Sequence, residues 1–145
     1  MNGHNHKSEE HNDAEGLTTL LSNFGPKETM DRLDREVQAQ GMRVFARINH
    51  AALAGETGMP LRPTELLIFG NPPAGTPLMQ ANQTMGIDLP LKVLVWQDVS
   101  GTTWFMYNDP CWLANRHSIG IKTERTVDLL GPALRAIAKK VTELP

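Results

Sequence analysis

The sequence predicts an α+β protein: a single compact domain with about five strands in a mixed sheet and its long helices packed on one face. Its 145 residues match the usual size of one domain, and 40 % apolar residues are enough for a hydrophobic core. The expected elements follow the order strand, helix, strand, strand, short helix, hairpin, helix. A doubly wound nucleotide-binding fold would alternate strand and helix more strictly and open with a glycine-rich turn.

The first expected elements are a strand at residues 17–22 and a helix at residues 26–40. The strand is rich in β-branched and apolar residues and ends in a turn sequence, Asn-Phe-Gly-Pro. In the helix, Met30, Leu33 and Val37 recur at the spacing of one helix face. This apolar stripe should face the sheet.

The middle of the chain is expected to contain two strands and two short helical segments. Residues 42–49 alternate apolar and mixed positions, which indicates a half-buried strand. The continuous apolar run at residues 66–69 fits a central strand covered on both sides. We expect a helical turn at residues 51–55 and a short helix at residues 76–84.

The last third of the chain is expected to form a hairpin and two helices. Residues 91–96 and 102–107 are apolar or aromatic, and the turn sequence Asp-Val-Ser-Gly separates them, which favours an antiparallel hairpin. A helical segment should follow at residues 110–117, and a final helix should begin near Arg125. One face of that helix carries Leu130, Leu134, Ile137, Ala138 and Val141.

Residues 1–15 are predicted to be a disordered polar tail, which leaves residues 16–145 as the domain. The tail has too little apolar surface to offset the entropy of ordering it. Its histidines His4, His6 and His11 could hold a divalent metal loosely. A polar tail with adventitious histidines explains the composition equally well, so we predict no metal site.

Charge and cysteine content exclude several classes of partner. The net charge of -2 and the sequence pI of about 6.2 supply no large positive field, so we expect neither nucleic acid nor a membrane as a partner. The single cysteine, Cys111, excludes an intrachain disulfide and a multi-cysteine metal site, and it favours the cytoplasm. The chain shows neither a signal-peptide pattern nor a run of 18 apolar residues.

Few side chains suggest chemistry. His50 and His117 are the two histidines beyond the tail, and each lies at an expected element end, where histidines more often cap backbone than catalyse. Asn71 follows the most apolar strand, but it also suits a structural turn. Asp109, Cys111 and His117 permit a nucleophile reading, although a lone cysteine is more often a small buried apolar group. Catalytic residues and cofactors therefore stay unassigned.

Aromatic residues gather in the expected hairpin. Trp96 and Trp104 lie near its turn, and aromatic side chains are enriched at protein interfaces. We expect them to contribute to the interface of a homodimer.

Several short blocks together resemble the bacterial and archaeal domain of unknown function 302 family. They are FGNP at residues 69–72, GTPLM at 75–79, DLPLK at 88–92 and YNDP at 107–110, followed by His117, with INHAA at 48–52 as an earlier block. The resemblance covers residues 17–145, with Asn49 where the family commonly has an aspartate. It implies a compact α+β domain that forms homodimers, and it implies no established activity or cofactor.

Three functions stay open at this point. The first is a small-ligand-binding or sensor domain. The second is a small enzyme in which His50 or His117 moves a proton and Asn71 or Tyr107 orients the substrate. The third is a structural homodimerisation module. For all of them we expect one shared cleft at element ends, formed by His50, Asn71, Asp88, Tyr107 and His117.

Overall fold

The computed structural model of the chain describes residues 14–119 and 124–145. Almost all of the expected tail, including His4, His6 and His11, lies outside these residues. The predictions of a disordered and metal-free tail therefore stay predictions.

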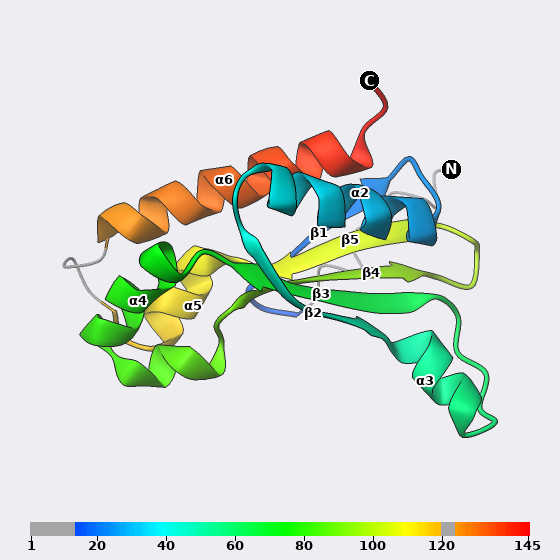
Figure 1. Cartoon of the computed structure of the whole chain (residues 1–145), viewed down its shortest axis with the longest axis horizontal. Helices are drawn as coiled ribbons and strands as arrows, with labels where there is room; N and C mark the ends of the chain where they lie inside the picture. The colour runs from blue at the N-terminus through cyan, green and yellow to red at the C-terminus, as the bar shows by residue number, and fades with distance from the viewer. Residues whose placement is uncertain (1–13, 120–123) are drawn as a thin grey trace.

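Five strands form one open sheet in the order β1-β5-β4-β3-β2 (Figure 1). The strands are β1 (Leu17–Ser22), β2 (Arg43–Asn49), β3 (Thr64–Gly70), β4 (Leu91–Gln97) and β5 (Thr103–Asn108). The α+β class, the five strands and the β4–β5 hairpin are confirmed.

Every pairing in the sheet is antiparallel, which differs from the mixed sheet that we expected. A strand–helix–strand connection commonly joins parallel neighbours, but here it does not. β1 and β2 do run in the same direction, but they lie at opposite edges of the sheet and never pair.

Two long helices cover one face of the sheet. The long helices are α2 (Pro26–Ala39) and α6 (Glu124–Thr142). The shorter helices are α3 (His50–Glu56), α4 (Pro72–Ala81) and α5 (Pro110–Arg116), with the 3-10 helix η1 (Gln83–Ile87) after α4. α2 and α6 lie side by side above the strands, as predicted (Figure 1). The apolar stripe of α2, Met30, Leu33 and Val37, is fully buried.

The main core lies between the sheet and these two helices. From β3 it contains Leu67 and Phe69, while Leu66 and Ile68 point to the opposite face and are partly exposed. Among the described elements, no helix lies across that opposite face (Figure 1). The apolar run at residues 66–69 is therefore a central strand covered on one side, where the sequence predicted both.

A second core cluster closes one end of the sheet. It joins α4, η1 and α5 through Leu78, Met85, Leu113, Ala114 and Ile119. The expected helix at residues 76–84 starts earlier, at Pro72, because Pro72 fits the first helical turn and Asn71 can precede it in an extended conformation. β3 ends, β4 begins and β5 ends at this end of the sheet, so loops and helices gather there (Figure 1).

Candidate functional site

The five residues expected in one cleft do not lie together. Antiparallel pairing of β2 with β3 places Asn49 opposite Glu65 and Arg43 opposite Gly70. His50 therefore lies beside the start of β3, whereas Asn71 follows the end of β3. The length of the strand separates the two residues by roughly 20 Å, at about 3.3 Å per residue. The prediction that His50 shares a site with Asn71 and His117 is wrong, because it assumed that polar residues after different strands meet at one sheet edge.

Tyr107 belongs to the main core. Its side chain lies in the main core, 4 % exposed, with its ring edge-on to Phe105 at 6.2 Å between ring centroids. Burial raises the pKa of the Tyr107 hydroxyl, and the negative charge of Asp109 adds to this. Tyr107 is a core residue with one polar atom.

Asp88 and His117 do form a pair. His117 ends α5 and is 8 % exposed, and its Nε2 atom lies 2.5 Å from Asp88 Oδ2. The other ring nitrogen, Nδ1, lies 2.9 Å from the Thr84 hydroxyl oxygen. Arg116 donates from one guanidinium nitrogen to both Asp88 oxygens, at 3.0 and 3.1 Å. Sequence reasoning missed Thr84, because an exposed threonine in a short segment carries no distinctive pattern.

Asn82 fixes the segment that presents Thr84. Its side-chain oxygen accepts from the Thr84 backbone N–H at 3.1 Å and so caps η1. Its side-chain nitrogen donates to the backbone oxygen of His117 at 2.5 Å. The two ends of the histidine site, η1 and the end of α5, are thus held together by one amide.

Asp109 and Cys111 do not join this group. Asp109 caps α5 by accepting from the Cys111 backbone N–H at 2.8 Å, so its carboxylate has a structural role. The Cys111 side chain is exposed, whereas we expected a small buried group. The acid beside His117 is Asp88, which lies far from the histidine in sequence.

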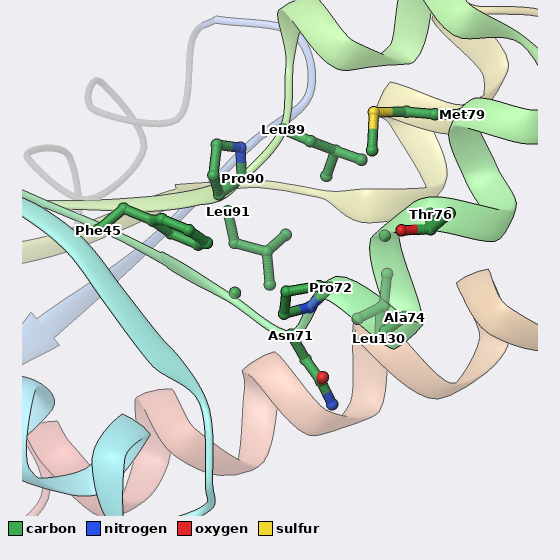
Figure 2. Close-up of a pocket in the computed structure, with 12 residues that line it drawn as sticks. Phe45, Asn71, Pro72, Ala74, Thr76, Met79, Leu89, Pro90, Leu91 and Leu130 are labelled. Atoms are coloured by element: carbon green, nitrogen blue, oxygen red, sulfur yellow. The ribbon is translucent and has the colours of Figure 1, made fainter.

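An apolar pocket opens at the same end of the molecule (Figure 2). Its volume is about 200 Å³. Side chains from β2, α4, the start of β4 and α6 line it: Phe45, Met79, Leu89, Pro90, Leu91 and Leu130. Figure 2 shows the Asn71 amide turned toward α6 and away from Met79, so Asn71 borders the pocket without aiming a polar group into it.

A β-bulge brings Phe45 to this pocket. The register of β2 against β3 shifts between Val44 and Ala46, so Phe45 leaves the strict alternation that the sequence predicted. Gly70 lies beside it, and a Cβ atom at Gly70 would come within 3.5 Å of Pro90 and 3.9 Å of Phe45. Pro90, which follows a cis peptide bond, forms the next part of the wall. A bulge leaves no clear mark in one sequence, which is why this wall was not predicted.

The pocket and the histidine site adjoin each other in the chain. Leu89 lines the pocket and directly follows Asp88. Leu89 and Met79 also pack against the second core cluster, which contains Leu113 and Ala114 of α5. A change of shape in the pocket can therefore reach the helix that carries His117.

A separate polar cluster joins α2 to the sheet near its other end. The Arg47 guanidinium on β2 binds Glu65 and Asp31 at 2.7 Å and Asp34 at 3.2 Å. Hydrogen bonds from Lys27 and then Arg47 hold the pKa of Asp31 below its usual value. In turn, hydrogen bonds to these carboxylates, Glu65 first, raise the pKa of the Arg47 guanidinium above its usual value. This cluster joins α2 to β2 and β3, and we assign it a structural role.

Fold and site together define a small α+β domain with an apolar pocket and a buried acid–histidine pair at one end of an antiparallel sheet. Residues 18–137 match the model of DUF302, a domain of unknown function, and the chain belongs to this family. A crystal structure of an uncharacterised conserved DUF302 protein from Bacillus stearothermophilus has the same fold. Its TM-score is 0.77 at 22 % identity, over 90 % of this chain and 100 % of that one.

Longer curated relatives share most of the sequence. A protein of Brucella suis named fluoride-specific ion channel FluC 1 is 44 % identical over 124 residues, which is 86 % of this chain and 49 % of that protein. A Brucella abortus protein of the same name has the same identity over 46 % of its length. The chain thus spans about half the length of these relatives. In the described part of this chain, we find no helix with the length and apolarity needed to cross a membrane.

Proposed function

We propose that the protein is a small-ligand-binding domain whose ligand occupies the apolar pocket where β3 ends and β4 begins. The observation that carries this proposal is an open pocket with six apolar side chains from four separate elements. Ligand sites commonly lie where several elements end and combine apolar walls with few polar groups. Here Thr76 is the polar side chain among the lining residues, while the Asn71 amide turns away toward α6.

The pocket size sets the class of ligand. Typical sites for drug-sized ligands measure about 300–1,000 Å³, so a pocket of about 200 Å³ suits a smaller molecule. None of the described residues that line the pocket carries a charge. A small neutral compound, such as a single aromatic ring, matches it best.

Ligand-observed NMR with phenol and indole as probes tests this proposal. Ala74→Leu adds three carbons at a lining residue of α4 and should abolish the binding signal. Ala81→Leu places the same side chain at an exposed position of the same helix and should leave binding unchanged. Equal loss in both variants, or binding that persists in Ala74→Leu, would contradict a ligand site in this pocket.

We also propose that the protein forms homodimers through the sheet face opposite α2 and α6. Leu66, Ile68, Leu94 and Met106 are partly exposed there, and the charged residues Lys92 and Arg43 share the face with them. An apolar face of this kind suits a self-complementary interface between two copies. Trp96 contributes to the face, whereas Trp104 is 3 % exposed and donates to Asp98 within the chain.

Sedimentation equilibrium tests the dimer. The wild-type chain should give about twice 16.1 kDa at micromolar concentration, and Leu94→Glu should reduce this to the chain mass. Leu144→Glu, the same change at an exposed position near the C-terminus, should leave the dimer intact. A wild-type protein that stays at the chain mass would refute the interface.

The Brucella relatives suggest where such a domain acts. Because this chain matches about half of proteins named as fluoride channels, we propose that it regulates a channel of that kind from the cytoplasmic side. The exposed free thiol of Cys111 agrees with a reducing compartment. Fluoride efflux from vesicles that contain a FluC channel should change when the chain is added. An identical efflux rate with and without the chain would contradict this role.

A further inference from the structure

We infer that Thr84, His117 and Asp88 form a nucleophilic site that cleaves activated esters of small carboxylic acids. The observation behind this inference is a continuous line of hydrogen bonds from a surface hydroxyl through a buried imidazole to a carboxylate. A hydroxyl becomes a useful nucleophile when an adjacent base takes its proton and an acid orients that base. This activity is independent of a ligand in the apolar pocket.

The proton positions follow from the tautomer that we assign to a neutral His117 ring. With Asp88 accepting at Nε2, the neutral His117 ring carries its proton there and presents the Nδ1 lone pair to Thr84. The Thr84 hydroxyl can also donate to Asn82 Oδ1, 2.9 Å away, because that oxygen has two lone pairs and accepts the Thr84 backbone N–H with only one of them. Donation of the hydroxyl proton to Nδ1 gives both His117 nitrogens a partner.

Exposure differs across the three groups in the order that catalysis needs. Thr84 is exposed, the Asp88 side chain is 15 % exposed, and His117 is 8 % exposed. The reacting hydroxyl is therefore open to a substrate, while the base and its acid are shielded. Ile87, 74 % exposed, lies on the same 3-10 helix as Thr84 and offers apolar contact to a short acyl group.

The reaction balances without a cofactor. As Thr84 Oγ1 forms a bond to the ester carbonyl carbon, its proton moves to His117 Nδ1. The bond from that carbon to the leaving oxygen breaks, and the leaving group takes the proton from Nδ1. Water then attacks the acyl-threonine with His117 again accepting a proton, which releases the carboxylic acid and restores the Thr84 hydroxyl. Asp88 stabilises the imidazolium that forms in each step.

Hydrolysis of p-nitrophenyl acetate tests the site, measured in a Cys111→Ser background to remove the exposed thiol. Thr84→Ala should lower the initial rate by about 100-fold or more, the range of general acid–base catalysis. Thr84→Ser, which keeps the hydroxyl and removes the methyl group, should retain or raise the rate. Mass spectrometry of the quenched reaction should find the acetyl group on the peptide that contains Thr84.

Thr57→Ala is the matched control, since Thr57 is an exposed threonine at the C-terminal end of α3 whose hydroxyl donates to Ala54. It should leave the rate unchanged. Both threonines are exposed, so these variants should keep the fold, which circular dichroism checks. A rate in Thr84→Ala equal to that of the Thr57→Ala control, or acetylation on other residues alone, would overturn the inference.

Discussion

Replacing Asp88 by alanine should destabilise the protein far more than the loss of a surface ion pair. Asp88 accepts from Arg116 and from His117, whose ring is almost completely buried. Exposed pairs such as Asp88–Arg116 contribute about 0–1 kcal/mol. The buried ring N–H of His117 would lose its acceptor, which costs about 1–3 kcal/mol. We therefore expect Asp88→Ala to lower the free energy of unfolding by about 1–4 kcal/mol, the sum of these two ranges.

Asp88→Asn separates geometry from charge. Its side-chain oxygen can still accept from His117 Nε2, so the loss should be about 1 kcal/mol, the difference between a charge-assisted and a neutral hydrogen bond. Urea unfolding followed by tryptophan fluorescence measures both values. Glu56→Ala, at the exposed end of α3, should stay within about 0.5 kcal/mol of wild type. Equal losses for Asp88→Ala and Glu56→Ala would refute the argument that His117 depends on Asp88.

Two further predictions concern titration. The lowered pKa of Asp31 means that its bonds to Lys27 and Arg47 stabilise the fold above the ordinary aspartate pKa and are lost as pH falls through the folded-state value. In the Arg47→Met variant, protonation of Asp31 should therefore lower the free energy of unfolding by less than it does in the wild type. An acid-unfolding curve with the same shape as the wild-type curve would contradict this. Tyr107 is the single tyrosine, and burial raises its pKa, so the neutral form stabilises the fold below pH 10 and this contribution is lost as pH rises through the folded-state pKa. Near-ultraviolet absorbance should show tyrosinate appearing above pH 10, and ionisation below pH 10 would contradict its burial.

Local patterns predicted most of the fold. The helical spacing of Met30, Leu33 and Val37 identified the buried face of α2, because an apolar stripe on one side of a helix is buried against another element. The hairpin of β4 and β5 followed from two apolar runs and a turn. The strand order of the sheet could not be predicted, since no local pattern indicates that α2 connects one edge strand of the sheet to the other.

The candidate site was predicted in part. Asp88 and His117 were both named, and the structure joins them. His50 was included because histidines suggest chemistry, and its position depends on a strand register that the sequence does not reveal. The roles of Thr84 and of the bulge at Phe45 were not predicted, because each depends on contacts with segments that are distant in sequence.

The two edge strands have a consequence for how the chain folds. β3, β4 and β5 pair in their sequence order, β4 with β5 through a short turn and β3 with β4 through the segment that contains α4 and η1, whereas β1 must find β5 across most of the chain, Leu17 opposite Asn108. Loop closure over such a distance costs entropy before any contact offsets it, and non-local pairing slows folding. The three central strands should therefore assemble first. The N-terminal strand then docks last and completes a sheet whose centre already exists.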